Sequence, residues 1–380
     1  MYFKDIIGHS DLQQSLTQTV KDDHVSHALM FAGKEGSGNL ALALSFSAYL
    51  LCKNRGAEDR CGVCANCKQL DQLAHPDLHF SFPFIKISDK IKVTQTFQRD
   101  FKEAVKKNPY LSLKDWEIEI AGENKQSIIT VDESAEIVKK LSLKSFAGGY
   151  KIMIIWMPEK LHTAAENKLL KTLEEPSPRT LIILVTEKVE ELLPTIISRV
   201  QMVKCRPLND EEVREGLTKK FRFSTEVAEK AAQLAEGNFN LALKIAKDPD
   251  AENAYFELFQ QWMRTCVAPK NHDIVEVTEK IAALSRDQQG YFLEYCLNFL
   301  HEAIMYAYLG KEKARYVGAA AEFAEKFAPY MAGKDLGAFH DTLSKGHRLV
   351  ERNVNPRLLY MKLSAEMIRI FMGKRPEPIS

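Results

Sequence analysis

Residues 33–40 carry the glycine spacing of a phosphate-binding loop without the side chains that handle phosphate. In the pattern G-x-x-x-x-G-K-[ST], the lysine neutralises charge on the β- and γ-phosphates and the hydroxyl holds Mg²⁺. Gly33, Gly36 and Gly38 supply the glycines, but Asn39 stands at the lysine position and Leu40 at the hydroxyl position. A neutral amide and an isobutyl group do neither task. We therefore expect that this chain does not hydrolyse ATP, and a weak phosphate site on the loop amides is left open.

Four cysteines form a second candidate site. Cys52, Cys61, Cys64 and Cys67 have the spacing C-x₈-C-x₂-C-x₂-C. Tetrahedral Zn²⁺ takes four soft ligands at ~2.3 Å, and C-x₂-C turns bring thiolates together in pairs. Since four thiolates leave no open position on the metal, the predicted zinc is structural. Four free thiols or a redox pair is the alternative.

Length and composition limit the remaining possibilities. The chain has 380 residues, enough for two or three domains, with 45% hydrophobic and 27% charged residues and a net charge of +1. The whole-chain charge gives no reason to expect strong attraction to nucleic acid or to a membrane. No apolar run approaches the ~18 residues of a membrane span, and residues 1–5 are no signal peptide. A cytoplasmic protein is expected, without disulfides.

The elements around these sites predict a doubly wound α/β domain over residues 1–206. Apolar runs that we interpret as strands alternate with helical periodicity, and the glycine loop stands between a strand and a helix, as a phosphate loop requires. Asp132 is the expected N-cap of one helix. The strands are expected at 26–32, 128–131, 151–156, 181–185 and 196–203, and the helices at 41–51, 133–143 and 164–175. Residues 84–127 are charged, fit this pattern poorly and are interpreted as an insertion.

The pattern changes after Pro207, where no convincing strand follows. Helices expected at 210–220, 225–236 and 239–246 predict a small helical domain over residues 207–250. Residues 251–380 are mostly helical by periodicity. Two apolar stripes there are interpreted as packing faces; they consist of Tyr291, Phe292, Tyr295, Cys296 and Phe299, and of Leu359, Tyr360, Leu363, Met367 and Ile370.

Together these features resemble the subunits of the bacterial DNA polymerase III clamp loader. That family joins an AAA+ core, with a RecA-like parallel sheet, to a Cys₄ zinc module that follows the phosphate-loop helix; the module would lie here at residues 52–67. The resemblance covers most of the chain and is weakest over 84–127. The residues that carry it are the four cysteines and the segments 26–28, 75–77 (His-Pro-Asp), 167–176 (NKLLKTLEEP), 198–199 (Ser-Arg) and 353–356 (Asn-Val-Asn-Pro).

Departures from the family pattern distinguish its two kinds of AAA+ subunit. Active tau/gamma subunits resemble this chain but carry an Asp-Glu pair where Trp156 and Met157 stand here. Glu159, two residues further on, is expected as a solvated charge. Asn240 stands at the expected position of the lid arginine, and Thr186 matches the first sensor. With the phosphate loop, four ATPase elements are missing, a pattern that matches the non-catalytic delta prime subunits.

The resemblance implies what such a subunit contributes. Delta prime subunits resemble a rigid stator and present a Ser-Arg-Cys arginine to the γ-phosphate of a neighbouring ATPase subunit. Arg199 matches that arginine, with Ser198 in a supporting role and Val200 in place of the cysteine. An arginine supplied in trans contributes ~10³-fold or more to catalysis. The other interpretation of Arg199 is a salt bridge within its own domain.

The implied partners are tau/gamma-type ATPase subunits and a delta subunit, with the sliding clamp and primed DNA reached through the complex. Residues 251–380 would join a helical collar that holds the loader together. Two other functions remain open. One is an active tau/gamma-type AAA+ ATPase with an atypical phosphate loop, in which Lys34 would have to replace the missing lysine. The other is a zinc-dependent nucleic-acid-binding module, which would rest on the cysteines alone.

Overall fold

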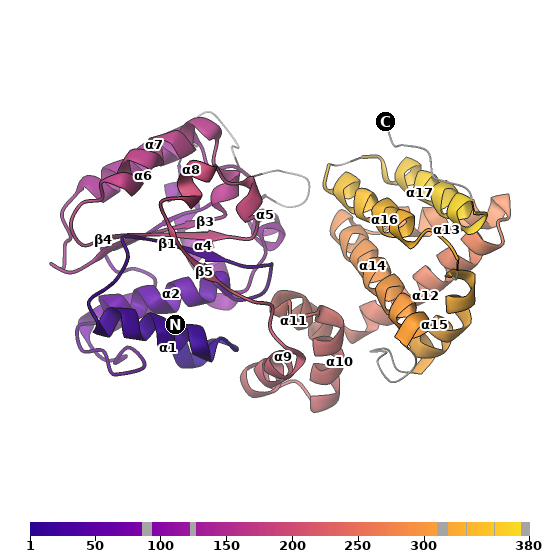
Figure 1. Cartoon of the computed structure of the whole chain (residues 1–380), viewed down its shortest axis with the longest axis horizontal. Coiled ribbons are helices and arrows are strands. Elements are labelled where there is room, and N and C mark those ends of the chain that lie inside the picture. Colours follow the sequence, from indigo (N-terminus) through magenta and orange to yellow (C-terminus); the bar gives the residue numbers. More distant parts are fainter. Residues whose placement is uncertain (86–92, 122–126, 310–317, 332, 353, 374–380) are drawn as a thin grey trace. The chain divides into compact units, whose positions relative to one another are not determined.

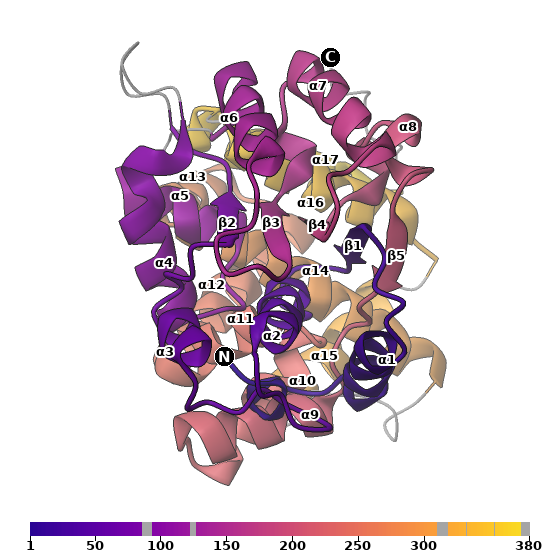
Figure 2. The same ribbon diagram turned by 90° about the vertical axis from the view of Figure 1, so that its left-hand side faces the viewer.

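Five parallel strands in the order β2-β3-β4-β1-β5 form the sheet of the N-terminal part of the chain (Figure 2). The computed structural model describes residues 1–85, 93–121, 127–309, 318–331, 333–352 and 354–373. These divide into two compact units, Met1–Ala246 and Lys247–Ser380. The strands are β1 (Ala28–Ala32), β2 (Leu78–Ser81), β3 (Lys151–Trp156), β4 (Thr180–Thr186) and β5 (Gln201–Lys204).

Both faces of the sheet are buried, and the three central strands are largely apolar and buried at every position. On β3, Ile152 and Ile154 belong to one core, and Met153 and Ile155 to the other. Helices α1 (Ser10–Lys21) and α2 (Asn39–Leu51) cover the first face, and α6 (Val131–Ser142) and α7 (Thr163–Glu174) cover the second (Figure 1). A parallel sheet with helices on both faces confirms the predicted doubly wound α/β core.

Several predicted elements are wrong in detail. The apolar run 128–131 is not a strand, because it makes only the isolated bridges Phe84↔Ile128 and Ile129↔Leu161 before α6 begins. The N-cap of α6 is Thr130, whose side chain accepts from Glu133 N, and not Asp132. Strand β2 was not predicted. Residues 196–197 belong to the short helix α8 (Pro194–Ile197), so the last strand begins only at β5.

The segment predicted as an insertion packs into the first core. Its helices α4 (Gln98–Lys107) and α5 (Leu113–Ala121) follow the short helix α3 (Ala65–Asp71). The rings of Phe82 and Phe101 stack with centroids 3.9 Å apart, and the buried Trp116 packs edge-on against both. Parts of the predicted insertion, 86–92 and 122–126, lie outside the described residues.

A small helical subdomain closes the first unit. It contains α9 (Asp210–Glu215) with a π-helical turn at Gly216–Lys220, α10 (Thr225–Ala235) and α11 (Phe239–Lys247). Its core of alanines and leucines includes Ile7 and Tyr110 from the α/β part. We refer to residues 207–246 as the lid. The predicted boundary between core and lid at 206/207 stays a prediction.

The second unit is helical throughout its described residues. Its helices are α12 (Pro249–Val267), α13 (Asn271–Ala282), α14 (Arg286–Leu309), α15 (Gly318–Met331), α16 (Leu336–Glu351) and α17 (Pro356–Phe371). Phe292, Cys296 and Phe299 of the first predicted stripe lie in its core, with all five residues of the second. Among the described residues, none of the helices is both long and apolar enough to span a membrane.

Candidate functional site

The glycine loop follows β1 and enters α2, the arrangement expected of a phosphate loop. Gly36 and Gly38 have φ angles of 70° and 92°, in the left-handed region that favours glycine. A Cβ added at Gly36 would come 1.8 Å from Asn238 Oδ1 of the lid. The loop therefore needs its glycines for its own turn and for the close approach of the lid, with or without a bound phosphate.

Asn39 is turned inward and holds the loop to the sheet. Its amide nitrogen donates to Gly33 O at 2.7 Å and to Thr186 O at 3.2 Å, and its amide oxygen accepts from the Ser37 hydroxyl at 2.9 Å. The side chain is 7% exposed. The position that carries the phosphate-binding lysine in the sequence pattern is thus a buried hydrogen-bonding group here.

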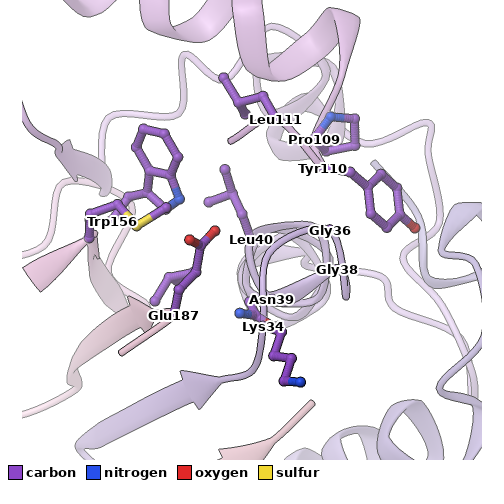
Figure 3. Close-up of a pocket in the computed structure, with 12 residues that line it drawn as sticks. Lys34, Gly36, Gly38, Asn39, Leu40, Pro109, Tyr110, Leu111, Trp156 and Glu187 are labelled. Atoms are coloured by element: carbon purple, nitrogen blue, oxygen red, sulfur yellow. The ribbon is translucent and has the colours of Figure 1, made fainter. Parts of the chain in front are cut away.

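The pocket beside the loop is lined largely by apolar side chains. Leu40, Trp156, Met157 and Val185 line it together with the loop. Figure 3 shows Leu40, Trp156 and the Glu187 carboxylate pointing into the same space. Positions 156 and 157 are Trp and Met, so neither offers the carboxylate that phosphoryl transfer requires to hold Mg²⁺ or to orient a water.

Glu187 lines the pocket and Glu159 lies beside it, so these acidic residues offer no positive charge to a nucleotide. Burial raises the pKa of Glu187 well above its ordinary value, and the nearby carboxylates of Glu35 and Glu159 raise it further. Glu159 is not the solvated charge that the sequence suggested. It is half-buried and accepts from the Thr186 hydroxyl at 2.8 Å and from Glu187 N at 3.1 Å. Thr186, the expected sensor, is therefore already paired.

The lid is fastened directly onto the loop and onto the segment 94–121. Phe239 N donates to Gly36 O at 3.1 Å. Asn240, at the expected position of the lid arginine, is 1% exposed; it accepts from Asn108 Nδ2 at 2.7 Å and donates to Asp115 Oδ2 at 2.6 Å. Lys244 lies 2.5 Å from Asp115 Oδ1. These contacts join the lid to the glycine loop and to the segment 94–121, and no motif in the sequence indicated them.

The four predicted zinc ligands converge. The sulfur atoms of Cys52, Cys61, Cys64 and Cys67 lie within 4.8 Å of one another. Cys52 Sγ is 3.6 Å from Cys61 Sγ and 3.5 Å from Cys67 Sγ, and Cys61 Sγ is 3.9 Å from Cys67 Sγ. A tetrahedron of sulfurs with ~2.3 Å metal bonds has edges of about 3.8 Å. The spacing therefore fits a tetrahedral metal ion, and all four thiols are free of disulfides.

Backbone and arginine contacts shape this cysteine module. Cys61 N points to Cys52 Sγ and Cys67 N to Cys64 Sγ, both at 3.4 Å, in the manner that favours a thiolate. The fully buried Arg60 side chain donates to Met1 O and Cys67 O and pairs with Asp71. It thereby joins the module to the start of the chain.

Arg199 lies between α8 and β5, and not within a strand as predicted for residues 196–203. Its Nε is 2.8 Å from Glu174 Oε1 and one terminal nitrogen is 2.5 Å from the same oxygen. The other terminal nitrogen donates to Thr195 O at 2.8 Å and to the Ser198 hydroxyl at 3.2 Å. The side chain is 33% exposed and forms a salt bridge within its own unit.

Asp77, in the His-Pro-Asp segment, organises an exposed loop. Its carboxylate accepts from Phe146 N at 2.7 Å, Ala147 N at 2.8 Å and the Ser145 hydroxyl at 3.1 Å. The ring of Phe146 is left 84% exposed. No sequence argument gave Asp77 this role, because its partners are about 70 residues away in the chain.

Comparisons with known proteins relate this chain to subunits of DNA polymerase III. A family model described as "DNA polymerase III, delta subunit" matches residues 8–209, more than half of the chain. DNA polymerase III subunit delta' of Bacillus subtilis is 31% identical over 202 residues, 53% of this chain and 49% of the relative. DNA polymerase III subunit tau/gamma of Haemophilus influenzae is 24% identical over 248 residues, 64% of this chain and 30% of the relative.

A solved structure of a DNA polymerase III gamma subunit-related protein from Thermotoga maritima aligns with a TM-score of 0.39 at 15% identity, covering 94% of this chain and 99% of that one. The matches cover about half or less of these curated relatives' own length.

Proposed function

The chain belongs to the delta prime subunit family of DNA polymerase III, and from that premise we propose that it is a non-catalytic clamp-loader subunit. In this role it acts as the stator that contacts a tau/gamma-type ATPase subunit and a delta subunit. Sliding clamp and primed DNA are reached through that complex. A role in replication places the chain in the cytoplasm.

The observation that carries this proposal is the state of the phosphate loop. Asn39 is bonded beneath the loop, and Leu40, Trp156 and Met157 stand where phosphate, Mg²⁺ and water would need polar partners. Glu187 places an acidic side chain, and no cation, beside the loop. A fold that retains the framework of an ATPase and fills its site with its own side chains supports a scaffold for other ATPase subunits.

Arg199 is the residue through which this subunit acts on its neighbour. A guanidinium presents paired donors to γ-phosphate oxygens and stays charged at any working pH. In this proposal Ser198 supports Arg199, and the hydrogen bond that Arg199 donates to the Ser198 hydroxyl is consistent with that role. The neighbouring site that Arg199 completes gains ~10³-fold or more from such a finger.

Steady-state ATPase of a reconstituted loader with clamp and primed DNA tests this role. Arg199→Ala should leave folding, metal content and assembly intact while removing the share of turnover that comes from the adjacent site. Arg199→Lys should restore it only in part, because one ammonium cannot reproduce the fork. Arg214→Ala is a matched control, since Arg214 also has a 2.5 Å ion pair and is 37% exposed. An assembled Arg199→Ala loader that performs like the parent would refute the finger.

ATP turnover by the isolated chain distinguishes the proposed non-catalytic stator from the alternative, an active ATPase. We expect no ATP turnover from rigorously purified protein. Lys34 is the lysine left in the loop, and robust turnover that is abolished by changing Lys34 would establish the tau/gamma-type alternative instead.

The cysteine module holds one structural zinc ion in this proposal. Cys52, Cys61, Cys64 and Cys67 supply four thiolates at tetrahedral spacing, which closes the coordination shell. When bound, the ion cross-links the end of α2 to the loop before α3. Since a closed site offers no position to a substrate, the module stabilises the unit and takes no part in chemistry.

The helical residues 251–380 form the collar through which the subunit assembles. The two predicted stripes supply this unit's own core, so assembly would use residues that remain exposed, such as Leu358 at 70% and Val275 at 45%. Deleting residues 251–380 should prevent assembly more than it harms the α/β core. Assembly retained by residues 1–250 would contradict the collar role.

A further inference from the structure

The guanidinium of Arg199 is not free to meet a phosphate in this structure. An arginine has five N–H donors. Two nitrogens face Glu174 Oε1, at 2.8 and 2.5 Å. The remaining terminal nitrogen donates to Thr195 O and to the Ser198 hydroxyl. These contacts occupy four of the five donors and fold the side chain back onto α7 and α8.

Glu174 stands in a place that its own helix does not favour. It is the last residue of α7, where the negative end of the helix dipole is unfavourable for a carboxylate. The adjacent Glu175 is the C-cap of the helix. Among the described contacts Glu175 has no hydrogen bond or ion pair with Arg199, so the two neighbouring carboxylates differ in this one respect.

We infer that Glu174 is a positioning residue for Arg199: its carboxylate holds the guanidinium in the isolated subunit and yields it to the γ-phosphate of the neighbour's ATP. This inference rests on the proposed function. The carboxylate engages Nε and one terminal nitrogen, the edge of the guanidinium that forms paired contacts with carboxylate and phosphate oxygens alike. The exchange replaces one anion by another at the same donors.

The ion pair between Arg199 and Glu174 is weak enough for a phosphate to replace the carboxylate. The side chains of Arg199 and Glu174 are 33% and 48% exposed, and ion pairs at such sites are weak because water screens them. A triphosphate carries more charge than one carboxylate and therefore displaces it when the neighbouring site closes. Until then Glu174 keeps the finger from stimulating ATP hydrolysis that is not coupled to clamp and DNA.

The test compares Glu174→Gln, Glu175→Gln, Arg199→Ala and the double variant Glu174→Gln/Arg199→Ala in the reconstituted loader. Each is measured without clamp and DNA, and with both at saturation. Glu174→Gln should raise the basal ATPase rate about two- to fivefold and leave the stimulated rate unchanged; fivefold corresponds to about 1 kcal/mol. Glu175→Gln, with the same change of charge, should match the parent. In the Arg199→Ala background, Glu174→Gln should have no effect.

The outcomes distinguish a failure of this inference from a failure of the proposed function on which it rests. If Arg199→Ala lowers the stimulated rate but Glu174→Gln matches the parent in both conditions, the inference alone is overturned. A basal increase that persists without Arg199, or a fall in the stimulated rate of Glu174→Gln, also overturns it. If Arg199→Ala matches the parent, the finger and this inference fail together. Glu174→Asp, which keeps the charge on a shorter side chain, should fall between parent and Glu174→Gln and guards against a folding defect.

Discussion

Replacing Asn39 tests whether the side chain at the lysine position of the loop pattern stabilises the fold through its hydrogen bonds. Asn39→Ala removes the two hydrogen bonds that the amide nitrogen donates to Gly33 O and Thr186 O, each contributing about 0.5–1.5 kcal/mol, and an amide oxygen that shares the single Ser37 hydroxyl proton with Lys34 O. Two partners keep another bond: the Ser37 hydroxyl donates to Lys34 O at 2.5 Å, and Thr186 O accepts from Gly33 N at 3.3 Å. Gly33 O loses the Asn39 amide without a replacement in the structure described here. We expect a loss of about 2–3 kcal/mol in the free energy of unfolding of the first unit.

Urea denaturation followed by tryptophan fluorescence measures this loss. Trp116 and Trp156 report on the first unit, and a Trp262→Phe background removes the signal of the second. Asn167→Ala makes the same change at an exposed position of α7 and should stay within about 0.5 kcal/mol of the parent.

Asn39→Lys restores the residue of the phosphate-loop pattern, yet it should also destabilise the unit, because an ammonium cannot accept from Ser37 and would be buried near Gly33 O and Thr186 O. A loss below about 0.5 kcal/mol for Asn39→Ala, or a stable Asn39→Lys variant, would refute the argument.

Three further perturbations follow from the same structure. Cys64→Ser combined with Cys67→Ser should lower bound zinc from about one per chain to none in metal analysis; unchanged zinc would reject the site. Burial lowers the pKa of His79 to about 4 in the fold, against ~6.5 when unfolded. The unfolded chain therefore binds a proton at His79 more readily than the fold does, so the free energy of unfolding should decrease as pH falls from ~6.5 towards ~4. The urea midpoint should show this slope, and His79→Asn should flatten it. Asp77→Asn should cost about 1.5–3 kcal/mol and speed amide exchange at Phe146; unchanged exchange there would count against the loop's dependence on Asp77.

The sequence predicted those features whose causes are local. The convergence of the four cysteines could be predicted because they lie within 16 residues of one another, at the spacing that a metal site requires. The buried strands β3 and β4 could be predicted because both faces of a parallel sheet must be apolar. Strand β2 was missed because its sequence Leu-His-Phe-Ser is short and only partly apolar, and its identity depends on pairing with β3.

The contacts that could not be predicted from the sequence join residues that are far apart in the chain. The inward turn of Asn39 requires Thr186, 147 residues away, and the ion pair of Arg199 requires Glu174, 25 residues away. Motif spacing identifies the residue type that is missing from a site, but it does not reveal which neighbour has taken up the space. For that reason the glycines of the loop could be recognised in the sequence, but the hydrogen bonds that hold the lid against the loop could not.

The fastening of the lid has an evolutionary consequence. Asn240 is bonded to Asn108 and Asp115, so an arginine placed there would first break two buried hydrogen bonds before it could meet any phosphate. Restoring the lysine of the loop breaks the bonds of Asn39 in the same way. Each single substitution towards the pattern of an active ATPase therefore costs stability. In the proposed non-catalytic subunit, the structural roles of Asn39 and Asn240 would oppose the return of catalytic residues at these positions.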